Sequence, residues 1–354
     1  MIPHNKPFLS KKSYQGVKKT FKSGWINYGE ISKDTEKTLS NIIYKNEQSA
    51  RLTVNGTSAL FLALKVLGIK KDDEVIIPTY TCTALLNAIN LLEARPVICD
   101  VSKKNLSFTK KLLIPHITKR TKAIIVVHTF GIPCKIKKIK ELNIPIIEDC
   151  SQSLGSKYKD GTIVGSFGDI SIFSFYASKL ITGGIGGAIT SPNPKIIELV
   201  DDYLNFDTPK TYKPRFNFLI SDINASIILA GLKELNHLLV KKQKISNKYQ
   251  SKIKSQYNSI KGQNHYRFLL KFETYEDLEK CQNFLLTCGI KTILPIEKFE
   301  LLHNYLKLDK HSYPNAESIA SRVLSIPIFP SLTPKEINYI KRSLRDYFST
   351  STCI

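Results

Sequence analysis

The chain has 354 residues, of which 23% are charged and 42% hydrophobic, and this ordinary composition excludes a disordered or fibrous protein. No apolar run approaches the roughly 20 residues that a membrane-spanning helix needs. The opening stretch, MIPHNKP, lacks the apolar core of a secretory signal. We therefore expect a cytoplasmic protein with no membrane partner, long enough for one large α/β domain and a smaller second domain.

The net charge of +22, from 52 Lys and Arg against 30 Asp and Glu, suggests anionic partners. The basic residues are spread along the chain, and the densest run, residues 241–244, is typical of a solvated helix face. No helix-turn-helix, zinc-finger or aromatic-interleaved basic motif accompanies the charge. We predict no nucleic-acid partner, and a phosphorylated small molecule remains a possible explanation for the charge.

Seven cysteines, at positions 82, 99, 134, 150, 281, 288 and 353, are scattered along the chain without a Cys-x-x-Cys pair. This spacing does not predict a zinc site or a thioredoxin-type motif. Reduced thiols are the expected state, and no metal site is predicted.

Between residues 54 and 190, short apolar runs alternate with amphipathic stretches. The runs are rich in β-branched residues, and they are predicted as buried strands at 74–77, 96–99, 123–127, 144–147 and 170–175. Helices are predicted between them at 58–67, with Gly68 as C-cap, and at 83–93. This alternation predicts an α/β fold whose large domain has a mostly parallel sheet between helices.

After residue 217 the pattern changes. A long amphipathic helix is predicted at 222–239 and continues into the stretch 241–254. An antiparallel strand at 266–272, a helix at 275–288 and a last helix from Pro334 follow. We expect a large domain over residues 1–240 and a smaller C-terminal α+β domain over residues 241–354.

Three polar features follow predicted strands, and ligands of open parallel sheets bind at the carboxyl ends of the strands. Glu148 and Asp149 follow one strand, Lys179 follows another, and Thr57 and Ser58 follow Gly56 at the start of a helix. Each has a purely structural explanation, as a solvated lysine, a helix cap or an ordinary Thr/Ser N-cap. Together they match the needs of pyridoxal 5′-phosphate (PLP): an imine-forming lysine, a carboxylate for the ring nitrogen and a phosphate cup at a helix N-terminus.

With these residues in place, the chain resembles the DegT/StrS family of nucleotide-sugar aminotransferases, which are PLP enzymes of fold type I. The resemblance runs from KSGW at 22–25 to LSIPIFP at 324–330. The motifs that carry it between these ends are NGTSAL at 55–60, DEVIIPTYT at 73–81, VHTFG at 127–131, IEDCSQ at 147–152 and GDISIFSF at 168–175, with Lys179 at the lysine position of the family.

The resemblance implies a role for each matching residue. Lys179 would hold PLP as a Schiff base and shuttle a proton, and Asp149 would pair with the pyridinium nitrogen. Gln152 would lie on the side of the ring hydroxyl. The phosphate ligands would be Thr57, Ser58, Ser174 and, from the neighbouring subunit, Asn217.

The same resemblance implies an activity and an assembly. The amino group of L-glutamate would pass through pyridoxamine phosphate to a keto group of a nucleotide-linked deoxy-sugar, as in polysaccharide and O-antigen biosynthesis. The enzyme would be a homodimer with shared active sites.

Three positions depart from the family pattern. Cys82 stands where an aromatic residue usually stacks on the PLP ring, so either Cys82 or Tyr80 would face the ring. Ile185 replaces a common acid in the glycine-rich turn, and Leu219 replaces a frequent arginine. These changes bear on cofactor stacking and substrate contacts.

Two other functions remain open from the sequence. A PLP-dependent sugar dehydratase is disfavoured because its relatives carry histidine at the position of Lys179. A non-catalytic protein of the same fold that regulates or binds nucleic acid is suggested only by the charge of +22. The keto-sugar, its nucleotide and the position of amination are not encoded in any motif that we can read.

Overall fold

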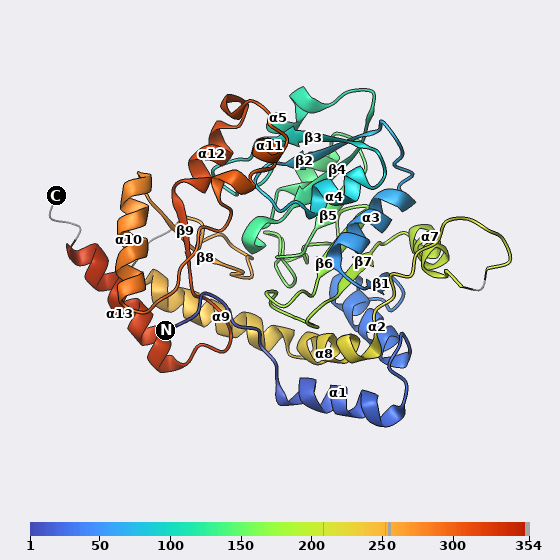
Figure 1. Ribbon diagram of the computed structural model, residues 1–354, viewed down its shortest axis with the longest axis horizontal. Coiled ribbons are helices and arrows are strands. Elements are labelled where there is room, and N and C mark those ends of the chain that lie inside the picture. The colour runs from blue at the N-terminus through green and yellow to red at the C-terminus, as the bar shows by residue number, and fades with distance from the viewer. Residues whose placement is uncertain (208, 252, 254–255, 351–354) are drawn as a thin grey trace.

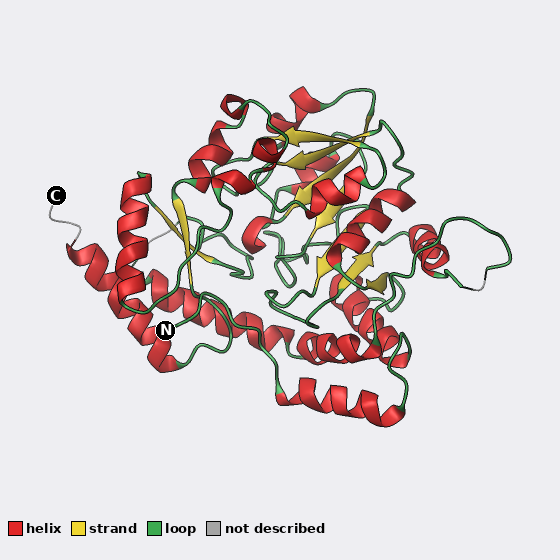
Figure 2. Ribbon diagram, viewed as in Figure 1, coloured by secondary structure: helices red, strands yellow, loops and turns green. Residues whose placement is uncertain are grey.

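The computed structural model describes residues 1–207, 209–251, 253 and 256–350. A seven-stranded sheet lies between helices, and a separate two-stranded sheet lies close to the C-terminal helices (Figures 1 and 2). The strands of the large sheet are β1 (Ala50–Thr53), β2 (Glu74–Pro78), β3 (Arg95–Cys99), β4 (Thr121–Val127), β5 (Ile146–Asp149), β6 (Ile170–Ser174) and β7 (Gly187–Thr190). Those of the small sheet are β8 (Phe268–Lys271) and β9 (Val323–Ile326).

The large sheet has the strand order β1-β7-β6-β5-β4-β2-β3. The strands from β3 to β6 pair in parallel, and β7 is antiparallel to both β6 and β1. Strands β2 and β5 are buried along their whole length, which explains why their sequences are continuous apolar runs rather than alternating ones. The predicted α/β fold with a mostly parallel sheet is confirmed.

The five predicted strands of the large sheet all exist, with bounds that differ by at most two residues. The apolar run predicted at 144–147 forms β5 two residues later, so Glu148 and Asp149 end the strand instead of following it. Strands β1 and β7 were not among the strands with predicted bounds. Neither contains a continuous apolar run, since β1 reads ARLT and β7 reads GAIT.

Helices cover both faces of the sheet and surround the C-terminal part (Figure 2). Those of the first half are α1 (Lys11–Ser23), α2 (Glu30–Tyr44), α3 (Gly56–Val66), α4 (Ala84–Asn90), α5 (Lys110–Leu113) and α6 (Ile136–Lys140). Those of the second half are α7 (Pro194–Leu204), α8 (Asp222–Lys233), α9 (Leu235–Gln250), α10 (Tyr275–Thr287), α11 (Leu302–Tyr305), α12 (Pro314–Ala320) and α13 (Pro334–Thr350). None of the described helices combines the length and the apolar character that crossing a membrane requires.

The predicted helix at 58–67 is α3, whose C-cap is Leu67 rather than the predicted Gly68; Gly68 is the next residue and takes the left-handed conformation with a φ of 78°. The predicted single helix over 222–239 is two helices, α8 and α9, because the helical path breaks at Glu234, where φ is −105° and ψ is 2°. Residues 252 and 254 of the predicted continuation lie outside the described part of the chain.

The C-terminal part has its own apolar core, formed by residues of α9, α10, α13, β8 and β9. Strands β8 and β9 pair antiparallel, as predicted for the strand at 266–272. The N-terminus also joins this part, since the Ile2 N–H donates to the Gly289 carbonyl at 2.7 Å. The domain boundary at residue 240 stays a prediction, and α9 crosses that position (Figure 1).

Candidate active site

The three polar features predicted from the sequence lie at one edge of the large sheet. Asp149 is the last residue of β5, Lys179 follows the end of β6, and α3 begins shortly after β1. Because β7 is antiparallel to both β1 and β6, the strands β1 and β6 run in the same direction. Their carboxyl ends therefore open on the same edge, which is where ligands of such sheets bind.

The start of α3 forms an anion cradle beside β6. The Asn55 side chain caps the helix by accepting the Ser58 N–H at 2.8 Å. The N–H groups of Gly56 and Thr57 remain in the first turn with the positive end of the helix dipole. A Cβ on Gly56 would lie 3.1 Å from the Ser174 Cβ, a tight contact, so the glycine favours the close approach of these two segments. The structure thus brings Ser174 to the helix start that carries Thr57 and Ser58.

Lys179 lies half-buried beside an aromatic ring. Its Nζ atom is 5.5 Å from the centre of the Tyr266 ring. Burial would raise the pKa of the Tyr266 hydroxyl, but the positive charges of Lys179 and Arg267 and hydrogen bonds from Ser178 and Lys179 hold it below its ordinary value. Within the described part of the chain, no carboxylate lies within 4 Å of the Lys179 amine.

The charges of Asp149 and Lys179 both affect the pKa of the Cys82 thiol. The Cys82 side chain is exposed, yet the surrounding protein and the charge of Asp149 raise its pKa, while Lys179 lowers it. One carboxylate oxygen of Asp149 accepts the Ser151 N–H at 2.9 Å. The Asp149 carboxylate and the Lys179 amine are therefore both close enough to Cys82 for their charges to act on its thiol.

Gln152 is oriented by its backbone neighbours. Its Oε1 atom accepts the Phe130 N–H at 2.8 Å, which leaves the amide nitrogen as the end that can donate to a ligand. Phe130 holds this N–H in place with a left-handed backbone, at a φ of 54°. The Asn264 side chain fixes the other end of the residue by donating to the Gln152 carbonyl at 3.0 Å.

The structure separates Tyr80 from Cys82. Tyr80 is fully buried and packs its ring edge against Phe130, with centroids 5.9 Å apart. Cys82, two residues later, is the exposed residue near Asp149 and Lys179. Of the two residues that the sequence left open, Cys82 is the one that borders the site.

Asn217 does not join the other predicted residues within one chain. It lies exposed in the segment between α7 and α8, next to Phe218, whose carbonyl accepts the Val54 N–H at 2.7 Å. In the described part of the chain, its side chain makes no hydrogen bond to the other predicted site residues.

Sequence reasoning missed Tyr266, whose ring lies beside the Lys179 amine, and Arg267, whose guanidinium lies over the same ring. Both were assigned to the predicted strand 266–272, but β8 begins only at Phe268. The signal that could have found them is an arginine beside a long apolar run, Phe268 to Leu270, because a cation is rarely placed there for packing alone.

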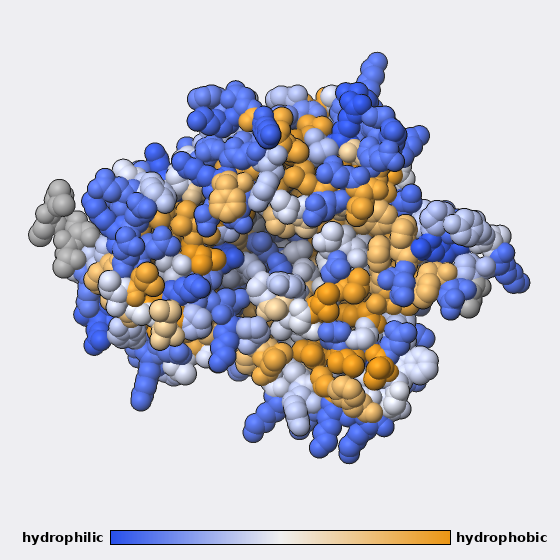
Figure 3. All heavy atoms as spheres, viewed as in Figure 1, coloured by the Kyte–Doolittle hydropathy of each residue, from blue (hydrophilic) through white to orange (hydrophobic). Residues whose placement is uncertain are grey.

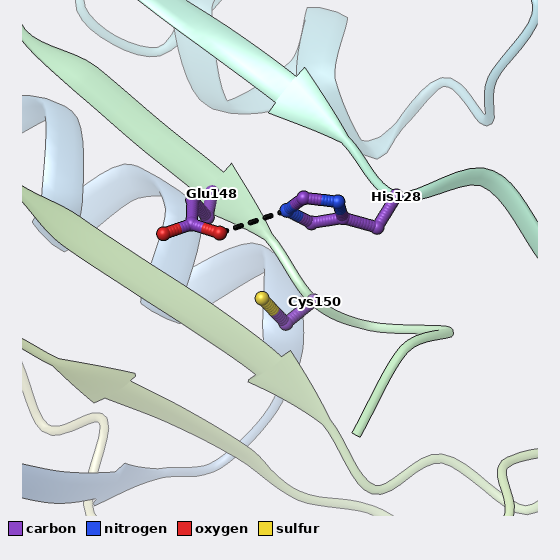
Figure 4. A group of neighbouring side chains, drawn as sticks. All are labelled: His128, Glu148 and Cys150. Carbon is purple, nitrogen blue, oxygen red and sulfur yellow. Dashed lines mark hydrogen bonds and ion pairs between the residues drawn. The ribbon is translucent and has the colours of Figure 1, made fainter. Parts of the chain in front are cut away.

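A buried polar cluster lies directly behind the site. Figure 4 shows His128, Glu148 and Cys150, which come close enough to suggest a metal site. However, His128 Nε2 hydrogen-bonds Glu148 at 2.8 Å, and His128 Nδ1 accepts the Cys134 N–H at 3.0 Å. Both ring nitrogens are therefore in use, and neither has a lone pair free for a metal.

Glu148 is instead a structural carboxylate. Besides His128, it accepts the Tyr158 hydroxyl and the backbone N–H groups of Gly165, Phe167 and Gly168. Burial would raise the pKa of Glu148, but His128 and the other donors hold it below its ordinary value. The cluster ties the loop before β6 to the end of β5 and so supports the position of Asp149.

Comparison with known proteins identifies the family. The model of the DegT/DnrJ/EryC1/StrS aminotransferase family matches residues 7–345. The chain belongs to this family. It is 34% identical to the GDP-perosamine synthase of Escherichia coli O157:H7, over 98% of this chain and 99% of that protein.

Solved structures show the same fold. A protein of Streptococcus pneumoniae described as a sugar aminotransferase, solved in its PLP form, is 26% identical with a TM-score of 0.88, over 99% of both chains. The aminotransferase TlmJ of Streptoalloteichus hindustanus is 23% identical with a TM-score of 0.89, over the full length of both chains.

The chain is thus a PLP-dependent sugar aminotransferase. The residues at the sheet edge fit the cofactor in their chemistry. They include an amine that has no acid partner within 4 Å among the described residues, a carboxylate at a strand end, and a helix start with hydroxyl groups where a phosphate can bind.

Proposed function

We propose that the enzyme moves an amino group from L-glutamate to a keto group of a nucleotide-linked deoxy-sugar, with PLP bound covalently to Lys179. The observation that carries this proposal is that Asp149 ends β5 and Lys179 follows β6, the neighbouring parallel strand, so that both lie at the same edge of the sheet. An amine and a carboxylate so placed can serve the reactive end and the ring nitrogen of one PLP molecule.

The roles of the individual residues follow from their chemistry. When bound, PLP withdraws electrons from the carbon that loses a proton. The Lys179 Nζ atom would take that proton and return it, and Asp149 would keep the ring nitrogen protonated. The Gln152 amide nitrogen would donate to the ring hydroxyl. Thr57, Ser58 and Ser174 would bind the phosphate at the start of α3.

We also propose a homodimer in which Asn217 reaches the phosphate of the neighbouring subunit. Its exposure on a segment that adjoins the start of α3 supports this arrangement. Apolar side chains of Trp25, Ile26 and Ile185 are exposed as well, and Figure 3 shows apolar residues gathered on one face of the molecule. A surface of this kind is typical of a protein interface.

The nucleotide-linked substrate is supported by a relative and by the charge. The GDP-perosamine synthase is named for a GDP-linked sugar. A net charge of +22 favours a substrate with phosphate groups. A place in polysaccharide or O-antigen biosynthesis and a cytoplasmic location stay predictions.

The first experiment tests Lys179. Purified protein given PLP should turn yellow, and borohydride should fix the cofactor onto Lys179, as located by peptide mass mapping. Lys179→Ala should lower transaminase activity at least about 10³-fold, because the variant loses both the attachment point and the proton carrier. The exposed Lys195→Ala is the matched control and should keep full activity. Attachment at another lysine would refute the assignment.

The second experiment tests the amino donor and the reaction. Glutamate should convert the yellow enzyme to its colourless amino form, and a nucleotide-linked keto-sugar should restore the colour. A panel of such sugars would identify the acceptor. A colour that no amino acid changes, with water eliminated from the sugar, would favour the dehydratase instead.

The third experiment tests the shared sites. Lys179→Ala and Asn217→Ala proteins should each be impaired. After mixing and subunit exchange, about a quarter of the sites would carry neither substitution, if each site combines Lys179 of one subunit with Asn217 of the other. Activity that does not recover in the mixture would refute the shared site.

A further inference from the structure

We propose that Arg267 binds a carboxylate of the amino donor in a small cavity beside Lys179. This inference rests on the proposed transamination and names the residue that selects its donor.

The cavity lies between the edge of the large sheet and the C-terminal part of the chain. Its volume is about 180 Å³, and it is lined by His4, Asn5, Ser178, Tyr266, Arg267, Ile293, Ser325 and Ile328. Ser178 precedes Lys179 in the chain, and Tyr266 stacks beside the Lys179 amine. Sites for large organic ligands start at about 300 Å³, so this cavity suits a small group rather than a whole nucleotide-linked sugar.

Arg267 is a cation without an anionic partner. In the described part of the chain its Nε atom is buried with no hydrogen-bond partner. One Nη atom lies 3.4 Å from the His4 Nε2 atom, and no carboxylate is within 4 Å. The charge of Glu300 acts on Arg267 only from a greater distance. An enclosed guanidinium without a counter-ion is costly, and binding an anion removes that cost.

Positively charged side chains also lie near Arg267. Burial, together with Arg267, Lys242 and Lys291, lowers the pKa of His4 to about 3, so His4 is neutral and can accept a hydrogen bond from Arg267. Burial and Arg267 lower the pKa of Lys242 to about 7. This positive neighbourhood favours an anionic group of a ligand.

The positions of the two cations suit one small amino acid. The Lys179 Nζ atom and the Arg267 Cζ atom are each 5.5 Å from the centre of the Tyr266 ring. They are therefore at most about 11 Å apart (twice 5.5 Å). A donor whose amino group reacts beside Lys179 can place a carboxylate against Arg267, which offers a forked pair of N–H donors.

A purely structural role for Arg267 must be distinguished from this one. Its guanidinium lies over the Phe130 ring at 5.6 Å and over the Tyr266 ring at 5.5 Å. Such contacts contribute to stability, whereas donor binding would appear as a change in the glutamate concentration that half-saturates the enzyme.

The experiment compares the holoenzyme with Arg267→Gln, Arg267→Lys and a charge-matched control, Lys271→Gln, at an exposed position on β8. Stopped-flow absorbance follows the loss of the yellow colour with glutamate alone. Arg267→Gln should raise the half-saturating glutamate concentration about 10- to 100-fold. Arg267→Lys should recover part of this loss, and Lys271→Gln should change it by less than about twofold, since an exposed charge acts weakly.

Three further readouts make the result decisive. Calorimetry of 2-oxoglutarate binding to the amino form of each enzyme should show the same loss of affinity for Arg267→Gln. Donors with either carboxylate replaced by an amide identify the group: the substitution at Arg267 should matter least for the donor that lacks the carboxylate it binds. The half-saturating concentration of the keto-sugar should not change.

Two outcomes would overturn the proposal for Arg267. One is a loss confined to the keto-sugar, which would assign Arg267 to the nucleotide phosphates. The other is a lower melting temperature with unchanged glutamate dependence, which would leave only the ring contacts. If glutamate does not bleach the unsubstituted enzyme, the proposed donor itself is refuted, and this result is distinct from both.

Discussion

Glu148 and Asp149 are consecutive carboxylates on β5, and their side chains point to opposite faces of the sheet. Glu148 accepts hydrogen bonds from the His128 ring, the Tyr158 hydroxyl and three backbone N–H groups. Asp149 is buried as well, but in the described part of the chain it accepts only the Ser151 N–H, and its charge acts on Cys82. One region is saturated by the protein and the other keeps its polar groups available, and this difference separates structural from functional side chains.

The largest effect is expected for a substitution of Asp149, the functional carboxylate of the pair. Asp149→Asn should lower transaminase activity about 10³-fold, because the neutral amide no longer stabilises a protonated ring nitrogen. The melting temperature of the cofactor-free protein should stay within a few degrees of that of the unsubstituted protein. Enzyme assays with glutamate and thermal unfolding of the same preparations check both expectations.

The matched substitution on the other face, Glu148→Gln, should give the opposite result. It leaves buried donors without their carboxylate, so the free energy of unfolding should fall by about 3 kcal/mol. Denaturant unfolding followed by circular dichroism measures this loss. If Glu148→Gln proved as stable as the unsubstituted protein while Asp149→Asn unfolded, the assignment of the two carboxylates would have to be reversed.

A second prediction concerns the stability that the folded protein loses by burying the Lys242 amine near another positive charge. The pKa of Lys242 is about 7, against an ordinary value of 10.5, because of burial and of Arg267. Between these pH values the folded protein binds fewer protons than the unfolded chain, so stability rises with pH, by up to about 1.4 kcal/mol per pH unit.

Lys242→Met removes this contribution. The variant should be more stable than the unsubstituted protein at pH 7, and its advantage should shrink as the pH rises toward 10. Free energies of unfolding at pH 7.5, 8.5 and 9.5 measure the difference. If the free energies of unfolding of the two proteins changed in parallel with pH, the pKa of Lys242 in the folded protein would not be lowered.

The smallest effect is expected at Cys82, the exposed border of the site. Cys82→Tyr should tighten cofactor binding about 2- to 10-fold, because an aromatic ring can stack on the pyridine ring for about 0.5–1.5 kcal/mol. Cys82→Ser is the control and should change little. Fluorescence titration of the cofactor-free protein with PLP gives the affinities, and weaker binding by the tyrosine variant would show that this position does not face the ring.

The sequence predicted the central strands well because they are buried on both faces. In β2 and β4 the apolar runs are long enough to be recognised without tertiary information. Strands β1 and β7 were missed because neither contains a continuous apolar run. The break at Glu234 was missed because amphipathic spacing continues across it.

For the site, motif order placed Lys179, Asp149 and the start of α3 at strand ends, and the sheet brings them to one edge. Motif order could not decide whether Tyr80 or Cys82 borders the site. The two residues are only two positions apart, and one side chain is buried in the core while the other is exposed. Nor could motif order find Arg267, whose position beside Lys179 depends on how the C-terminal part packs against the sheet. Contacts between residues that are far apart in the chain leave no pattern in the local sequence.

The attachment of the first residues has a practical consequence for protein engineering. Ile2 is anchored to Gly289, His4 and Asn5 line the cavity that contains Arg267, and the Asn5 side chain donates to the Ser178 carbonyl at 3.0 Å. A purification tag fused close before Met1, or trimming of residues 1–5, would therefore disturb the wall of that cavity. Affinity handles and fluorescent labels are better carried at the opposite end of the polypeptide, beyond α13.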